Sequence, residues 1–191
     1  LDISEKRKEA LAHYHLDDHK KTIVILGGSL GARAINQAVE KNLNAILEHN
    51  VQIIRQSGKL YFEEYKRYNE TKGVQVHEFI QKMDLLYAAA DIIISRAGAG
   101  TISELCIVGK PVVFIPSPNV AEDHQTKNAM ALVENGAAKM VSDNEVNQKL
   151  IPLLQSLMQD EQARKLMEEK IKAHAFINAD EVIAEQILQH I

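Results

Sequence analysis

Tryptophan is absent from this sequence, which holds only four phenylalanines and five tyrosines. The aromatic side chains on which single-strand nucleic-acid-binding proteins stack bases are therefore scarce. The formal net charge of −4 points the same way, because binding to a phosphate backbone needs a basic face. We therefore expect no nucleic-acid partner.

Cysteine occurs once, at Cys106, so an internal disulfide is excluded and a reducing compartment is indicated. Cys106 lies between apolar neighbours in a predicted helix, which favours a buried structural thiol over a nucleophile. No apolar run approaches the length of a transmembrane helix, and no N-terminal signal pattern is present. The sequence starts at Leu1 rather than methionine, so we expect a fragment or a processed product.

The composition is typical of a globular protein, with 46% hydrophobic and 25% charged residues. A length of 191 residues predicts one domain, or one domain with a helical appendage.

Residues 1–21 are charged and weakly helical over 5–12, which favours a solvated, flexible lead-in over a metal site. The histidines and aspartates of this segment match no usual zinc spacing. They are His13, His15, His19, Asp17 and Asp18.

From residue 22 onward, short apolar runs alternate with amphipathic stretches. The runs at 22–26, 51–55, 73–77, 91–95, 111–115 and 138–141 predict strands. The stretches at 32–49, 61–69, 83–90, 101–108 and 124–134 predict helices, and the pattern is helical from 144 to the end with breaks near 160 and 178. This alternation predicts an α/β, Rossmann-like, doubly wound parallel sheet of about six strands with helices on both faces.

One loop organises the sequence, between the apolar strand ending at Ser95 and a helix predicted to begin at Thr101. Gly98 and Gly100 permit a tight turn and the close approach of a ligand. A helix start directs free N–H groups and partial positive charge at the loop, which favours phosphate. Glu104, one turn into the helix, is placed to accept hydrogen bonds from a sugar diol. Taken alone, however, Thr101-x-x-Glu104 also fits a capping box that only satisfies helix-end amides.

A second glycine loop, Gly27–Arg33, follows the first predicted strand and strengthens the case for a ligand. It is not the dinucleotide fingerprint, because Ser29 occupies the second glycine position, and no Gly-Lys-Ser/Thr closes it as in a Walker A loop. The next strand ends without an acidic residue to hold an adenosine ribose. A nicotinamide dehydrogenase and a P-loop hydrolase are therefore disfavoured.

Ligands of parallel sheets bind at the carboxyl ends of the strands, where four loops are expected to meet: 27–33, 77–80, 96–104 and 117–125. We expect Ser29 and the amides of Gly28 to Gly31 to hold one phosphate. The amides of Ala99 to Thr101, with the Thr101 hydroxyl, would hold another. Together these features make a pyrophosphate-linked sugar the favoured ligand.

The remaining candidates have plainer interpretations beside the functional ones. Phe79 and Ile80 offer an apolar edge whose backbone could read a base, or they are core residues. Gln125 can donate to and accept from a sugar hydroxyl, or it is a solvated residue at a helix start, as His124 is. Arg96 could contact phosphate or pair with a neighbouring acid.

Five motifs occur in the order and spacing of one known family. They are Gly27-Gly28-Ser29-Leu30-Gly31-Ala32-Arg33, Glu78-Phe79-Ile80, Ser95-Arg96-Ala97-Gly98-Ala99-Gly100-Thr101-Ile102-Ser103-Glu104, Gly109-Lys110-Pro111 and Asp123-His124-Gln125-x-x-Asn128-Ala129. Over residues 21–141 the chain resembles the C-terminal half of the MurG family, the peptidoglycan N-acetylglucosaminyltransferases of the GT-B fold.

The resemblance implies transfer of N-acetylglucosamine (GlcNAc) from UDP-GlcNAc to lipid I, giving lipid II, with inversion and with neither metal nor cofactor. The C-terminal half holds the donor. The N-terminal half, absent here, meets the lipid I acceptor and supplies the candidate base, so no catalytic residue is expected in this chain. The full-length protein would be cytoplasmic and peripheral on the cytoplasmic face of the bacterial inner membrane.

Carried over by motif, the resemblance assigns Ser29 to the pyrophosphate, the backbone of Ile80 to uracil, Glu104 to ribose and Gln125 to the sugar. Phosphate is assigned to Ala99, Gly100 and Thr101, and Ile102 and Ser103 complete that binding segment. Gly28, Gly31, Phe79 and His124 are further candidates. Leu30 departs from the glutamine common in the family's first loop, and Gly100 is smaller than the residue many relatives have.

The expected organisation is a lead-in over 1–21, a UDP-GlcNAc-binding domain over 22–175 and a C-terminal helix over 176–191. Two other functions stay open. One is a different enzyme on the GT-B plan, either a nucleotide-sugar epimerase or another UDP-sugar transferase. The other is a non-catalytic nucleotide-binding or scaffold domain.

Overall fold

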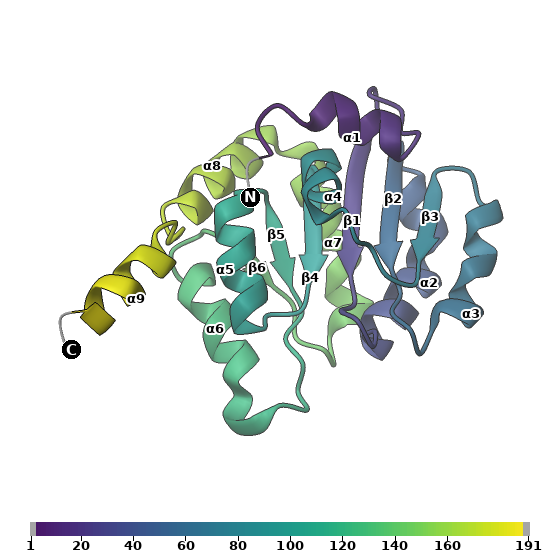
Figure 1. Cartoon of the computed structure of the whole chain (residues 1–191). Helices are drawn as coiled ribbons and strands as arrows, with labels where there is room; N and C mark the ends of the chain where they lie inside the picture. Colours follow the sequence, from purple (N-terminus) through teal and green to yellow (C-terminus); the bar gives the residue numbers. More distant parts are fainter. Residues whose placement is uncertain (1–2, 189–191) are drawn as a thin grey trace.

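The computed structural model describes residues 3–188, which form a six-stranded, all-parallel sheet between two layers of helices (Figure 1). The strand order is β3-β2-β1-β4-β5-β6. The strands are β1 Lys21–Leu26, β2 Val51–Gln56, β3 Val74–His77, β4 Ile92–Ser95, β5 Val112–Phe114 and β6 Lys139–Met140. The predicted Rossmann-like class and the number of strands are confirmed, because this is the order of the doubly wound dinucleotide fold.

Helices cover both faces of the sheet. One face carries α1 (Arg7–His13), α4 (Met83–Ala89), α5 (Ala99–Val108) and α6 (His124–Val133). The other carries α2 (Arg33–Leu47), α3 (Phe62–Tyr65) with the 3₁₀ helix η1 (Lys66–Glu70), and α7 (Val146–Gln159). Helix α8 (Glu161–Lys172) contributes to both cores, and α9 (Ala179–Leu188) extends from the body in Figure 1.

The inner strands are apolar on both faces because helices cover both. In β1, residues 22–26 are all buried, and in β4 all four residues are buried. The edge strand β3 instead alternates, with Val74 and Val76 buried and Gln75 and His77 half-buried. Full burial of an isoleucine or leucine side chain contributes about 1.5–3 kcal/mol, so these strands anchor the fold.

The sheet reverses its winding between β1 and β4, which lie side by side in parallel. Their last residues, Leu26 and Ser95, are register partners. The glycine loop after β1 leads to α2 on one face, and the loop after β4 leads to α5 on the other. A crevice opens where two such loops diverge, and this fixes the place of the site.

The prediction of a solvated lead-in over 1–21 is wrong for α1. Ala10 and Tyr14 are buried in the core, where α1 packs beside α4. Lys6 donates to Asp84 at 2.6 Å, and Arg7 pairs with Asp91 at 3.4 Å. Helix α1 is therefore part of the domain.

One other element differs in detail from the sequence pattern. The helix predicted over 61–69 is one α-helical turn followed by the 3₁₀ helix η1. The predicted break near 160 is confirmed, because Asp160 ends α7 and caps α8 by accepting from the amide of Ala163 at 2.8 Å. The second break separates α8 from α9.

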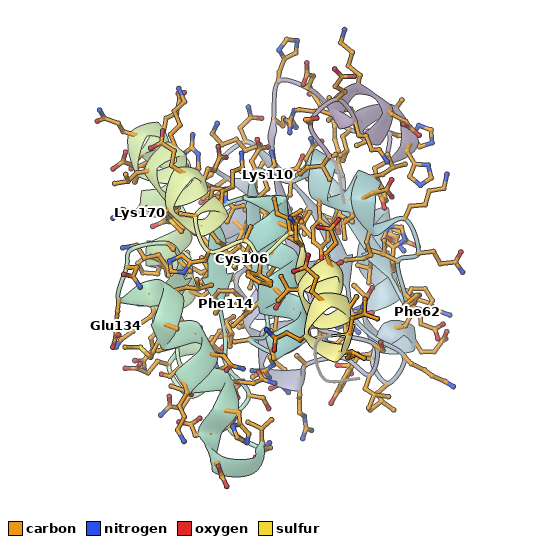
Figure 2. All side chains as sticks on the ribbon, turned by 60° about the vertical axis from the view of Figure 1, so that its left-hand side comes forward. Phe62, Cys106, Lys110, Phe114, Glu134 and Lys170 are labelled. Atoms are coloured by element: carbon orange, nitrogen blue, oxygen red, sulfur yellow. The ribbon has the colours of Figure 1, made fainter. Side chains whose placement is uncertain are left out.

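Cys106 is buried, as predicted, between α5 and the sheet near Phe114 (Figure 2). Burial raises the pKa of its thiol, which disfavours the reactive thiolate. Within residues 3–188, no group of three or more histidine, cysteine, aspartate or glutamate side chains is arranged to bind a metal ion. No helix in the same range has the length and apolar character needed to cross a membrane.

His77, at the end of β3, provides a test of the packing through pH. Burial, and secondly the neighbouring His13, lower the pKa of its imidazole, and its Nε2 is buried without a partner among the described residues. In the unfolded chain His77 takes up a proton below about pH 6.5, whereas in the folded chain it does so only at lower pH. The free energy of unfolding therefore falls as the pH drops below about 6.5. We expect His77→Gln to reduce this loss of stability. The reduction should be smaller than about 1.4 kcal/mol per pH unit, which is the effect of one full proton.

The measurement is urea unfolding at about pH 7.5 and about pH 5.5. His174→Gln, which replaces an exposed histidine of the same domain, is the control. Equal loss of stability in wild type and His77→Gln would contradict the assigned burial.

Candidate functional site

A cavity of about 260 Å³ opens at the carboxyl ends of β1, β2 and β4. The two glycine loops and the β3–α4 loop all contribute to its wall. Of the residues predicted for the site, it is lined by Gly28, Ser29, Phe79, Ile80, Thr101 and Glu104. Leu26, Gln56, Met83, Tyr87, Ser95 and Arg96 complete the lining. The expectation that these loops meet at one edge is confirmed.

A second cavity, of about 560 Å³, lies beside the first, and Arg96 lines both. Its wall includes Gly31, Tyr61, Ser117 and Gln125. The smaller cavity is lined from the loops after β1, β3 and β4, and the larger one from the loops after β1, β4 and β5, so both lie at the carboxyl edge of the sheet.

Helix α5 begins at Ala99, two residues before the predicted start, and its N-cap is Gly98. The capping-box interpretation is therefore wrong: Thr101 lies within the first turn, and no side chain caps the helix. Ile102 makes the first intrahelical bond, to the carbonyl of Gly98 at 2.9 Å. No group among the described residues accepts from the amides of Ala99, Gly100 and Thr101. These free donors, with the helix dipole, form an anion site.

The first glycine loop offers fewer amides than predicted. The Gly31 N–H donates to the carbonyl of Gly28 at 3.2 Å and so is not available to a phosphate. The amides of Gly28, Ser29 and Leu30 have no acceptor within the described chain. Gly28 and Ser29 are exposed at the cavity wall, so the side chain and amide of Ser29 remain candidates for an anion.

Gly31 instead allows the first glycine loop to pack closely against the loop after β2. Its φ of +96° and its position leave no room for a side chain, since a Cβ would lie 2.3 Å from the carbonyl oxygen of Ser57. Gly58 faces it just as closely. Two backbone hydrogen bonds, from Lys59 to Ser29 and from Leu60 to Leu30, complete this contact. The loop after β2 thereby holds the first glycine loop in place.

Glu104 reaches the cavity from the second turn of α5 and is half-buried. Its Oε2 accepts a hydrogen bond from the Tyr87 hydroxyl at 3.0 Å. Burial and the Glu104 carboxylate both raise the pKa of Tyr87, so the phenol stays a donor at neutral pH. Tyr87 orients the carboxylate and leaves Oε1 for a ligand. No local sequence pattern indicates this role for Tyr87, which lies 17 residues away in the chain.

Ile80 and Phe79 differ in their surroundings. Ile80 is buried, at 4% exposure, and its N–H donates to Gln56 Oε1 at 2.9 Å. Only the carbonyl of Ile80 is then left to contact a ligand. Phe79 is 57% exposed at the cavity rim, so the alternative of a core residue is wrong for Phe79.

Gln125 holds the second glycine loop. Its Oε1 accepts from the amides of Ala97 at 3.2 Å and Ser117 at 2.9 Å. One turn further along α6, the side chain of Asn128 donates to the carbonyl of Ala97 at 3.3 Å. Gln125 can therefore donate to a sugar hydroxyl through Nε2, but its oxygen is not free to accept as predicted.

Arg96 pairs with an acid, as its plainer interpretation held. Its Nη1 donates to Asp143 Oδ1 at 2.5 Å and to the carbonyls of Ile115 and Pro116. These bonds join the ends of β4 and β5 to the loop after β6. The pairing leaves Nη2 and Nε without partners in the described chain, at the junction of the two cavities.

Some of the predicted residues do not line either cavity. His124 is the exposed first residue of α6, and Ser103 is exposed with its hydroxyl donating to the carbonyl of Ala99. Ile102 packs against the core. Ala99 and Gly100 are exposed at the helix start, where their amides have no acceptor in the described chain.

A doubly wound sheet with a cavity at its switch point and a free helix N-terminus in the wall defines a Rossmann-like domain equipped for an anionic ligand. The particular family follows from comparison with known proteins. The chain belongs to the glycosyltransferase family 28 C-terminal domain family, whose model matches residues 22–187.

Individual relatives agree with this membership. The UDP-N-acetylglucosamine–N-acetylmuramyl-(pentapeptide) pyrophosphoryl-undecaprenol N-acetylglucosamine transferase of Christiangramia forsetii is 50% identical over 187 residues, which are 98% of this chain and 51% of that protein. The protein of the same name from Flavobacterium psychrophilum is 50% identical over 189 residues, covering 99% of this chain and 52% of its own length. The crystal structure of Acinetobacter baumannii MurG matches with a TM-score of 0.76 and 30% identity, over 98% of this chain and 54% of its own. The resemblance to the MurG family is thus confirmed, and the chain spans about half the length of these relatives.

Gly98 provides a test that separates anion binding from folding. Its φ of −64° suits any residue, and a Cβ there would meet nothing nearer than Thr101 Oγ1 at 3.8 Å. We expect the carboxylate of Gly98→Asp to cap the free amides of α5 and to repel a diphosphate. Thermal stability should hold or rise, while the affinity for UDP, measured by calorimetry, should fall at least about tenfold.

Gly98→Ala is the matched control, because it adds the same Cβ without an acceptor. It should bind UDP as the wild type does. Equal UDP affinities of the aspartate and alanine variants would show that the α5 amides do not hold the anion.

Proposed function

We propose that this chain is the donor-binding half of a glycosyltransferase that transfers GlcNAc from UDP-GlcNAc to lipid I and so makes lipid II. The observation that carries the proposal is the free N-terminus of α5, uncapped by any side chain and lying in the same cavity wall as Ser29 and Glu104. Membership of glycosyltransferase family 28 and the names of the relatives support the reaction and its substrates.

The site divides into parts that suit the parts of a UDP-sugar. The amides of Ala99, Gly100 and Thr101 and the loop at Ser29 would hold the pyrophosphate. Glu104, oriented by Tyr87, would accept from the ribose hydroxyls. The apolar edge at Phe79 and Ile80 would receive the uracil, and the larger cavity, with Gln125 Nε2 in its wall, would receive the sugar.

The chemistry that this half contributes is stabilisation of the leaving group. When the acceptor hydroxyl oxygen bonds to the anomeric carbon, the bond from that carbon to the diphosphate breaks and UDP gains negative charge. The amides at the start of α5 point at this charge and need no rearrangement to stabilise it. The acceptor and the base that takes its proton belong to the other half of the protein. We propose no catalytic residue in this chain, which alone would bind the donor without turning it over.

The proposal extends to organisation and place in the cell. Residues 22–175, joined by the packed helix α1, would form the nucleotide-sugar-binding unit, with 176–191 as a C-terminal helix. The complete protein would act as a peripheral protein on the cytoplasmic face of the bacterial inner membrane, where its lipid acceptor is found. Assay of the complete protein with a lipid I analogue separates this function from a nucleotide-sugar epimerase, another transferase or a non-catalytic domain.

Glu104 tests the proposed ribose contact. We expect the chain to bind UDP-GlcNAc with a dissociation constant between about 1 μM and 1 mM, because one wall of the site is missing. Glu104→Ala should weaken UDP binding by about 1–3 kcal/mol, the scale for losing hydrogen bonds to a charged group. The same substitution should matter less for 2′-deoxy-UDP, which lacks one of the two hydroxyls.

Isothermal titration calorimetry of both nucleotides with both proteins gives the coupling between Glu104 and the 2′-hydroxyl. An equal loss for UDP and 2′-deoxy-UDP would rule out the bidentate contact. Failure of the wild-type chain to bind any UDP compound would overturn the proposed function itself.

A further inference from the structure

Gln56 is a polar side chain in the cavity wall that has no part in the UDP-sugar contacts proposed so far. It is the last residue of β2, is only 6% exposed, and lines the cavity of about 260 Å³. In the sheet it is the register partner of both Leu26 and His77. Gln56 therefore lies between the first glycine loop and the loop that carries Phe79 and Ile80.

The orientation of the Gln56 amide is fixed by its partner. The N–H of Ile80 lies 2.9 Å from Gln56 Oε1, and only the oxygen of a carboxamide can accept. Nε2 must then point away from Ile80. No acceptor within the described chain receives it. The buried side-chain atoms that lack a partner there are Arg55 Nη2 and His77 Nε2. Gln56 Nε2 is not among them, so this donor is accessible, and the open space beside it is the cavity.

The same cavity wall also holds a free acceptor, the carbonyl of Ile80. The Ile80 carbonyl receives no hydrogen bond from the described residues, while the Ile80 N–H is already used. The cavity therefore presents one donor, from Gln56, and one acceptor, from Ile80, beside the apolar side chains of Phe79 and Met83. A flat heterocycle with an acceptor next to a donor is complementary to this pair.

Uracil has that pattern and cytosine has its reverse. Uracil carries a carbonyl at position 4 next to an N3–H, whereas cytosine carries an amino group at position 4 next to an unprotonated N3. Building on the proposed function, we propose that Gln56 Nε2 donates to the position-4 carbonyl of uracil and makes the site select uridine over cytidine nucleotides.

The order of the strands favours position 4 over position 2. The proposed ribose contact, Glu104, follows β4, and β1 separates β4 from β2 in the sheet. A base attached to that ribose would extend toward β2. The edge that meets Gln56 is then the one farther from the glycosidic bond, and that edge carries position 4.

The test compares UDP with CDP by calorimetry on wild type and Gln56→Glu. A glutamate still accepts from the Ile80 N–H, so the loop keeps its tether, but its second oxygen accepts where the amide donated. The added negative charge affects both diphosphates alike and cancels in the ratio of affinities. We expect wild type to prefer UDP by about tenfold or more, and Gln56→Glu to reduce that preference at least about tenfold or invert it.

An unchanged ratio in a folded Gln56→Glu variant would overturn the role of Gln56 and leave the proposed function intact. Binding of neither nucleotide by wild type would overturn both. If the variant fails to fold, the test is the affinity of the wild-type chain for 4-thio-UDP. The sulfur at position 4 of this nucleotide is a weaker hydrogen-bond acceptor than oxygen. A several-fold weaker affinity for 4-thio-UDP than for UDP supports the contact, and equal affinity contradicts it.

Discussion

The parallel pairing of β1 with β4 is the constraint on which the site depends. Because Leu26 and Ser95 are register partners, two loops far apart in sequence start from adjacent points and then diverge to opposite faces. The backbone, rather than any one side chain, thus brings the Ser29 loop and the start of α5 to one cavity. Three flanking hydrogen bonds hold these loops: Gln125 accepts one from the Ala97 amide, while Asn128 and the Gly31 amide donate the other two.

The site concentrates polar groups whose hydrogen bonds the protein leaves unmade. Helix α5 has a glycine N-cap where a serine or aspartate would stabilise the helix. Gln56 and Gln125 each line a cavity and have a side-chain amide group without an acceptor in the described chain, while the oxygens of both side chains accept from backbone amides. Each glutamine therefore links loop structure to ligand recognition. Proteins keep such unsatisfied groups where a ligand completes them.

The sequence predicted the sheet well and the site's internal bonds poorly, for distinct physical reasons. Continuous apolar runs such as 92–94 predict buried strands, because helices cover both faces of the sheet there. The glycine loops mark the ends of two of these strands, β1 and β4. The start of α5 was misplaced because a glycine cap leaves no side-chain signal, whereas Thr101 and Glu104 imitate a capping box. Tyr87 and Gln56 were missed because their partners lie 17 and 24 residues away, a distance at which local pattern carries no information. Burial of α1 rests on Ala10 and Tyr14, too few apolar residues to predict an amphipathic helix.

The central claim is that the amides at the start of α5 and in the first glycine loop together hold the diphosphate of a nucleotide. The most direct test is a titration of ¹⁵N-labelled protein with UDP, followed by amide chemical shifts. We expect the largest shifts on the amides of Gly28, Ser29, Ala99, Gly100 and Thr101, and we expect them to saturate together. Saturable shifts confined to the opposite end of the sheet, around Arg7 and Lys110, with these five amides unmoved, would contradict it.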